Sequence, residues 1–248
     1  MDQGVNRDSA ATASFPTTHW SLVIQAGSPA SPQARAALEA LCSAYWYPLY
    51  AFFRRKGNDP DRALDLTQDF FARLFEKDIL AAVEHRKGRF RSFLRVACRN
   101  FLIDAWRHRP DVASTRISID ARDAEGRYLV EPADNLTAER LFDRAWALTL
   151  LDQVMAILTA EYADSGRSEL FDQLKIVLTE GKGAVRSAVL AERLGMSEDA
   201  INTAGHRLRK RYRAILQEQI AATLDDPSDL DDEIRSLFDA IRPESAHR

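Results

Sequence analysis

The sequence predicts an all-α fold of two helical domains joined by a flexible linker. Apolar residues recur every three or four positions over most of the chain, which is typical of helices that cover a core. Residues 111–136 lack this periodicity and are rich in Asp, Glu and Pro, as expected of a tether. A short alternation typical of a strand, over 116–119, lies inside this segment.

The first predicted domain covers residues 15–110. Residues 1–14 are small and polar and are expected to be disordered. Helices are then predicted over 20–25, 32–55, 60 to about 77, and 89 to about 108. In the break before the third helix, Asp59 is a good N-cap and Pro60 suits the first helical position. Pro110 ends the fourth helix.

The second predicted domain covers residues 137–224. Helices are predicted over 137–162 and 170–179, and then on either side of Gly195. Residues 225–248 form an acidic C-terminal extension, in which an amphipathic helix carries Leu230, Ile234, Leu237, Phe238 and Ile241.

Composition excludes several classes of protein. No apolar run approaches the ~18–20 residues that a membrane-spanning helix needs, and residues 1–4 lack the basic start of a signal peptide. We therefore expect a cytoplasmic protein that makes no membrane contact. Cys42 and Cys98 lie in predicted helices and are expected to be reduced core thiols.

Neither an enzymatic reaction nor a cofactor or metal is expected. The five histidines are scattered without ligand spacing, and no Gly-rich phosphate loop or nucleophile motif is present. Asp65 and Asp69 are spaced i, i+4 and could in principle hold a metal, but no His or Glu lies in register with them. The chain is therefore expected to act by binding.

Charge is segregated along the chain, although the net charge is only −3. Basic residues gather at 85–109, opposed there only by Asp104, and again at 207–213, while acids gather at 225–233. Basic clusters of this kind are typical of nucleic-acid contact. The acidic segment either shields the second basic cluster until a partner binds or serves as a solubilising cap on the last helix.

Residues 188–213 have the pattern of a helix-turn-helix. Gly195 can close the first helix in the left-handed conformation, and Ser197 is a good N-cap for the second. The predicted core stripe of the second helix is Ile201, Gly205, Leu208, Tyr212 and Ile215. Ser197 and the exposed face are the candidate major-groove residues, the latter comprising Asn202, Thr203, His206, Arg207, Arg209, Lys210 and Arg213. The alternative is an ordinary helical hairpin with a solvated charged face.

The predicted helix over 89–108 carries a row of arginines. Its core stripe is predicted to be Phe90, Leu94, Ala97 and Phe101. Arg91, Arg95 and Arg99 repeat every four residues on another face, beside Asn100. Such a row can follow a phosphate backbone, and arginine can stack on an unpaired base. The alternative is solvated arginines paired with acids, which the scarcity of acids in this helix weakens.

The helix that begins at Pro60 carries an aromatic and acidic face. Leu66, Phe70 and Leu74 suffice to anchor it, so Phe71 and Phe75 are either partly exposed or complete a contact with the helix over 32–55. Periodicity slightly favours the second reading. If exposed, they would form a protein-docking surface together with Asp65, Gln68, Asp69 and Arg73.

In these segments, and in this order, the chain resembles the sigma-70 family of bacterial RNA polymerase, specifically the short extracytoplasmic-function (ECF) type. Residues 65–75 resemble the polymerase-docking segment of the family. Residues 89–109 resemble the segments that melt and read the minus-ten promoter element, and 190–213 the helix-turn-helix that reads the minus-thirty-five element. The ends, 15–23 and 231–238, resemble a subgroup with extended termini.

The resemblance implies a sigma factor that recruits core RNA polymerase to promoter DNA and promotes transcription initiation, as a monomer within the holoenzyme. It implies contacts with the polymerase β flap and with the β′ clamp, the latter through Asp65, Gln68, Asp69, Phe71, Arg73 and Phe75. It implies that minus-ten DNA contacts Arg89, Phe90, Arg91, Ser92, Arg95, Arg99, Asn100 and Arg107. The linker would pass near the path of nascent RNA. An anti-sigma factor or a regulatory protein kinase is a candidate partner.

Two features depart from the family pattern, and rival functions remain. Gly205 lies inside the recognition helix, where glycine costs ~1 kcal/mol relative to alanine. That helix also begins with Glu198 and Asp199, which repel phosphates. The nearest rival is a one-component helix-turn-helix regulator that acts outside the holoenzyme. Further rivals are a helical enzyme and a polymerase-binding protein that does not contact DNA.

Overall fold

The computed structural model describes residues 32–74, 89–107, 121–130, 136–179, 187–224 and 226–242. These residues are mostly helical and contain no strand, only an isolated antiparallel bridge between Arg89 and Leu224. The all-α prediction is therefore confirmed for the described part of the chain. The helix predicted over 20–25 lies outside it.

The first helical break lies where local sequence signals place it. Helix α2 (Pro32–Arg55) is followed by Gly57, which has a φ of 92°, and α3 (Pro60–Leu74) begins at the predicted proline. The Asp59 carboxylate accepts a hydrogen bond from the backbone N–H of Arg62 at 2.8 Å, which caps α3. The predicted continuation of α3 to about residue 77 lies outside the described residues.

Aromatic side chains hold α2, α3 and α5 (Phe90–Arg107) together. Phe53, Phe70 and Phe101 come from these three helices in turn, and their ring centroids lie 5.5–6.4 Å apart. Leu94 and Phe101 are buried as predicted, whereas Ala97 is only half-buried because Cys98 turns inward instead. Each aromatic pair adds about 0.5–1.5 kcal/mol to the gain from area burial.

Helix α6 (Ala121–Val130) occupies the middle of the expected linker, so the prediction of a structureless tether is wrong for these residues. Glu125 forms a bidentate ion pair with Arg54 of α2, at 2.8 and 2.9 Å, and also accepts from the Tyr50 hydroxyl. Arg127 stacks over the Tyr47 ring at 4.1 Å. These contacts join α6 to residues that are distant in sequence, so the local sequence pattern of 121–130 could not predict them.

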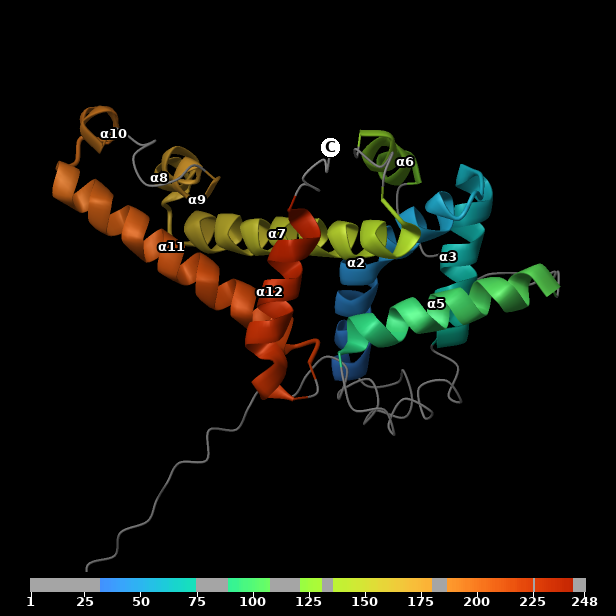
Figure 1. The fold of residues 1–248 in the computed structure, drawn as a ribbon. Helices are drawn as coiled ribbons and strands as arrows, with labels where there is room; N and C mark the ends of the chain where they lie inside the picture. The colour runs from blue at the N-terminus through green and yellow to red at the C-terminus, as the bar shows by residue number, and fades with distance from the viewer. Residues whose placement is uncertain are drawn as a thin grey trace, which may run out of the picture.

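Helix α7 (Ala138–Asp164), capped by Thr137, lies in the middle of the molecule, between the helices around α2 and those around α11 (Figure 1). Its buried residues Phe142, Trp146 and Leu150 pack on α2, and the buried side chains of both halves form one connected core. In this structure the expected domains, 15–110 and 137–224, are therefore not separated. The separation was inferred from the lack of helical periodicity over 111–136. That pattern does not show whether the helices before and after this segment pack against each other.

The next helices lie around the C-terminal end of α7, and the last helix packs against α7 again. Helices α8 (Ser168–Leu174), α9 (Ile176–Thr179) and α10 (Ser187–Leu194) precede the long α11 (Glu198–Ala221). A 3₁₀ turn (Pro227–Asp229) then leads into α12 (Leu230–Ile241), which packs against α7 and α11 (Figure 1).

Among the described helices, none combines the length and the apolar content that a membrane crossing needs.

The two cysteines, Cys42 and Cys98, are free thiols. Burial raises the pKa of Cys42 to about 12, with a smaller contribution from Glu39, and raises that of Cys98 as well. Both therefore stay protonated and unreactive at neutral pH.

Candidate nucleic-acid interface

Helices α10 and α11 lie where the helix-turn-helix is predicted, and a tight turn joins them. Gly195 has a φ of 62°, and the N–H groups of Gly195 and Met196 donate to the carbonyls of Glu192 and Ala191, which is the Schellman arrangement. The Ser197 hydroxyl then accepts from the N–H of Ala200 at 3.2 Å and caps α11. The turn and the start of the second helix are thus fixed by the two residues that the sequence pattern singled out.

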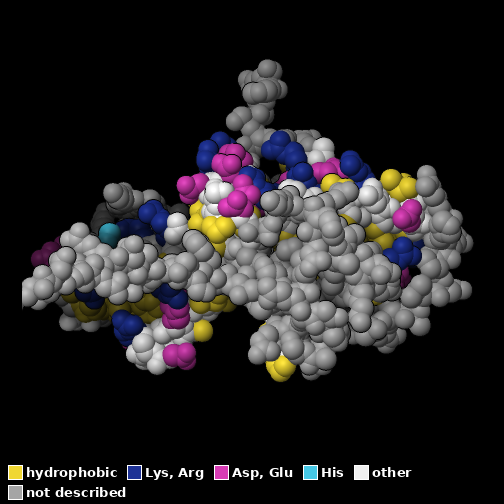
Figure 2. All heavy atoms as spheres, turned by 90° about the horizontal axis from the view of Figure 1, so that it is seen from below, with side chains coloured by type: hydrophobic (Ala, Val, Ile, Leu, Met, Phe, Trp, Pro, Cys, Tyr) yellow, Lys and Arg dark blue, Asp and Glu magenta, His cyan; other side chains and the backbone are white. Residues whose placement is uncertain are grey.

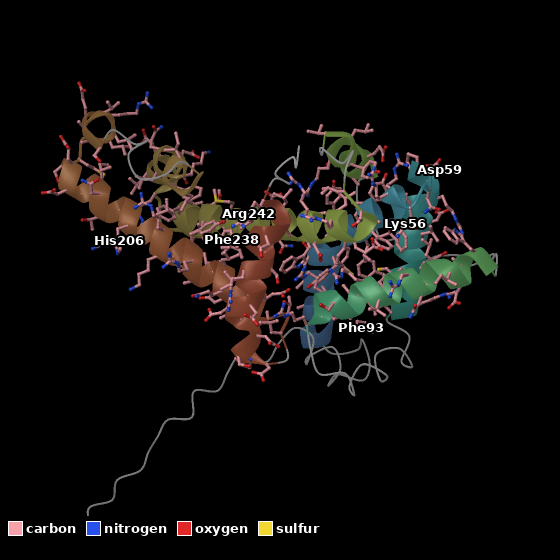
Figure 3. The ribbon with its side chains drawn as sticks, viewed as in Figure 1. Lys56, Asp59, Phe93, His206, Phe238 and Arg242 are labelled. Carbon is pink, nitrogen blue, oxygen red and sulfur yellow. The ribbon has the colours of Figure 1, made fainter. Side chains whose placement is uncertain are left out.

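The two faces of α11 separate as predicted. Ile201, Gly205, Leu208 and Ile215 are buried, and Tyr212 is half-buried. The candidate contact residues are all exposed, namely Ser197, Asn202, Thr203, His206, Arg207, Arg209, Lys210 and Arg213. Figure 3 shows His206 on the outer half of α11, away from the helices around α2. This face of α11 is therefore exposed to solvent.

Asn202, Arg211 and Glu218 of this helix are engaged within the protein. The Asn202 amide oxygen accepts from the Ser187 hydroxyl of α10 at 2.7 Å. Arg211 pairs with Glu161 of α7 and with Glu218, which fixes α11 on α7. Hydrogen bonding to Arg211 lowers the pKa of Glu161. Arg211 is therefore structural, whereas its basic neighbours point outward.

The arginine row of α5 differs from its predicted state. Arg91 is buried, with 6% of its surface exposed, and its guanidinium pairs with Glu233 at 2.8 Å and Asp143 at 2.6 Å. Arg95 is half-exposed and pairs with the other oxygen of Asp143 at 2.6 Å, whereas Arg99 is exposed. The expectation of an open row is wrong for Arg91, because α7 and α12 supply the acids that α5 itself lacks.

The other minus-ten candidates are divided between core and surface. Phe90 is buried against Tyr45, with ring centroids 5.2 Å apart, so the prediction that it contacts DNA directly is wrong in this structure. Arg89 is half-buried and pairs with Asp232 and Glu233. Ser92 and Asn100 are exposed, and the side chain of Arg107 lies outside the described residues.

An exposed apolar stripe on α5 was missed in the sequence. Val96, Ile103 and Trp106 are exposed, Trp106 at 66%, and they lie beside Arg99 and Asn100. Their spacing of seven and three residues places them on one helix face, opposite the core residues Leu94 and Phe101. Extending the helical period beyond the core stripe would have revealed them. This outer face of α5 combines an aromatic ring, an arginine and an amide, which suits an unpaired base.

The predicted docking surface on α3 is only partly exposed. Asp65 is exposed and Asp69 and Arg73 are half-buried, but Gln68 and Phe71 are buried. The assignment of Gln68 and Phe71 to a docking surface is therefore wrong. The reading that periodicity slightly favoured for Phe71, a place in the core, is confirmed, since its ring packs beside Phe70 at 6.2 Å between centroids. Phe75 lies outside the described residues. Burial and the neighbouring Asp65 raise the pKa of Asp69.

No described cluster of His, Cys, Asp or Glu could hold a metal ion. On the face in Figure 2, the described basic and acidic side chains are interspersed and do not form a patch of one sign. The candidate interface therefore consists of two separate surfaces, the exposed face of α11 and the outer face of α5.

A scan against protein-family models found no match to this chain, and neither a curated protein nor a solved structure matches it.

Proposed function

We propose that this chain is a sigma factor of the ECF type, which binds core RNA polymerase, recognises the minus-ten and minus-thirty-five elements and promotes transcription initiation. The observation that carries the proposal is the helix-turn-helix of α10 and α11, with its Schellman turn, its Ser197 cap and an exposed row of Asn, His, Arg and Lys. The protein acts in the cytoplasm by binding alone, with neither a cofactor nor a reaction of its own.

The exposed face of α11 contacts the minus-thirty-five element in the major groove. Asn202 and Arg207 lie in the first half of the helix, which is the part that reaches base edges in this type of docking. Arg209, Lys210 and Arg213 follow and hold phosphates. Glu198 and Asp199 face the dipole at the N-terminus of α11, so they stabilise the helix and keep that end away from the backbone of the DNA.

The outer face of α5 holds the opened minus-ten element. Trp106 and Arg99 offer planes on which an unpaired base can stack, and Asn100 can bond its edge. Extruding a base costs a few kcal/mol, which stacking of about 1–3 kcal/mol per base offsets. Docking on the polymerase β′ clamp is assigned to Asp65, Asp69 and Arg73 of α3. The second half of the chain, residues 137–224, contacts the β flap.

In vitro transcription tests the proposal. Purified chain is added to core RNA polymerase with genomic promoter fragments, and specific transcripts are mapped. We expect initiation that requires the chain and that Arg207→Ala reduces at least tenfold, while the matched Arg242→Ala, a change in an exposed arginine of the C-terminal end, has no effect. Transcripts that do not depend on the chain would contradict the proposal.

A one-component helix-turn-helix regulator is the second candidate. The observation that favours it is that α11 is open while Arg91 of α5 and the preceding Arg89 are engaged in ion pairs. Such a regulator would bind a specific duplex tightly without polymerase. Nanomolar binding of the chain alone to a duplex, with no effect on polymerase in the assay above, would select this function instead.

A further inference from the structure

Helix α12 lies against the end of α5 that carries Arg89 and Arg91. Glu233 pairs with Arg91 at 2.8 Å and with Arg89 at 3.2 Å, and Asp232 pairs with Arg89 at 3.5 Å. Arg89 also donates to the Ser236 hydroxyl at 3.3 Å, and its backbone bridges Leu224 just before α12. Three side chains of α12 thus hold the two arginines at the start of α5. Figure 3 shows Phe93 at this end of the helix.

The contact between α12 and the start of α5 is buried where it faces the core and is open to solvent on its outer side. Glu233 is 1% exposed, and the Arg91 guanidinium stacks on Trp146 at 4.6 Å. Around it lies a hollow of about 420 Å³, lined by Arg95, Arg140 and Asp143 together with Ser236 and Asp239 of α12. A competing anion can therefore reach the arginines from solvent without first unfolding the core.

The acids of α12 do not pair with the recognition helix. Among the described ion pairs, Asp232 and Glu233 join arginines of α5 and of α12 itself, and none reaches the exposed basic residues of α11. The hypothesis that the acidic segment shields the second basic cluster is therefore wrong for these residues. The basic surface that it covers is the first one.

We propose that α12 is an intramolecular latch that closes the arginine face of α5 to DNA. Glu233 and Asp232, assisted by Asp143 of α7, occupy Arg89 and Arg91 at positions where the phosphates of a promoter strand would otherwise bind. In this closed state α11 is open and the start of α5 is not. A DNA strand positioned by the polymerase displaces the carboxylates, so the free chain is kept from binding single strands. This inference rests on the proposed function.

Three acid-to-amide variants of the full chain test the latch. Glu233→Gln removes the buried carboxylate, Asp232→Asn removes the more exposed one, and Asp231→Asn is the control. Asp231 lies in the same helix and is exposed, and its substitution changes the net charge equally. Affinity for a labelled single strand is measured by fluorescence anisotropy over a range of salt. Hydrogen exchange monitors α12 separately from α7 and α11.

We expect Glu233→Gln, which removes the carboxylate that Arg89 and Arg91 share, to bind the single strand about tenfold more tightly than the control. Its salt dependence should steepen by ~0.7 for each arginine that then contacts a phosphate. Asp232→Asn should shift affinity in the same direction by about two- to threefold, and being exposed it leaves the core intact. Amide exchange should rise in α12 while α7 stays protected. Equal affinities for Asp232→Asn, Glu233→Gln and Asp231→Asn would overturn the latch.

The two proposals fail in different ways. If the wild-type chain directs initiation by core polymerase but the three variants bind single strands alike, the latch is wrong and the sigma-factor proposal stands. If no variant and no wild-type chain directs initiation, the sigma-factor proposal is wrong. Faster exchange in α12 of Glu233→Gln, compared with Asp231→Asn, would then still show that these ion pairs hold the helix.

Discussion

Helices α5 and α11 are both basic in sequence, yet α11 presents most of its basic side chains to solvent while α5 buries its first arginine, Arg91. The recognition face of α11 is open from Asn202 to Arg213, whereas Arg91 of α5 is buried between Asp143 and Glu233. The difference arises because α11 projects beyond the end of α7 (Figure 1), whereas Arg91 at the start of α5 meets Asp143 of α7 and Glu233 of α12. A basic helix thus becomes a binding surface or an anchor according to which acids the fold brings to it.

The largest expected effect is on Arg91, compared with Arg99 in the same helix. Arg91→Ala leaves Glu233 buried without that partner, and removal of one member of a buried ion pair costs ~3–5 kcal/mol. Arg99→Ala, on the exposed face, should change stability by less than about 0.5 kcal/mol. Urea unfolding of both variants measures the difference. Equal effects would mean that α5 is as open as α11.

The next effect concerns the turn that presents α11. Gly195 has a φ of 62° and open space where a Cβ atom would lie, so Gly195→Ala carries only the backbone cost of ~1–2 kcal/mol. Gly126 in α6 also has open space but helical geometry, so Gly126→Ala should stabilise by ~0.5–1 kcal/mol. Thermal unfolding compares the two. Changes of the same sign would contradict the assigned turn.

The third prediction tests how α6 is anchored. The hydrogen bond from Arg54 lowers the pKa of Glu125, and burial opposes this. A lowered pKa gives stability above the unfolded value, near ~4.3, which is lost as pH falls through the folded pKa. Glu125→Gln should therefore cost about 1–2 kcal/mol at pH 7 and much less in acid, at a pH below the folded pKa.

Urea unfolding at both pH values measures this loss, and Glu192→Gln on the exposed surface of α10 is the matched control. The stability gap between wild type and Glu125→Gln should close in acid, while the control shows no gap at either pH. A gap of constant size would show that the ion pair with Arg54 does not anchor α6.

The smallest effect separates basic neighbours on α11. Lys210→Ala should weaken duplex binding by a few-fold and reduce the salt dependence by ~0.9, the contribution of one phosphate contact. Arg211→Ala should leave the salt dependence unchanged and instead lower stability, because Arg211 pairs with Glu161 and Glu218. Anisotropy with a promoter duplex, combined with urea unfolding, distinguishes the two. A reduced salt dependence for Arg211→Ala would place it on the DNA face.

Local signals predicted the helices and turns well. The bounds of α2, the Asp59 cap and the turn at Gly195 and Ser197 each depend on residues within a few positions of one another. Helix α6 was missed because its contacts, from Glu125 to Arg54 and from Arg127 to Tyr47, join residues far apart in sequence. The exposed stripe with Trp106 was detectable from its spacing, and periodicity already favoured the burial of Phe71, but the burial of Gln68 depended on its neighbours in the fold.

The sequence by itself determined where α2, α3 and α11 begin, and which face of α11 is apolar, since capping, glycine conformation and periodicity are short-range properties. Only the tertiary structure decided which charged groups meet. Asp143 and Glu233 lie far from Arg91 along the chain, at separations of 52 and 142 residues. An ion pair depends on distance in space, so the closing of α5 beside an open α11 is a property of the fold.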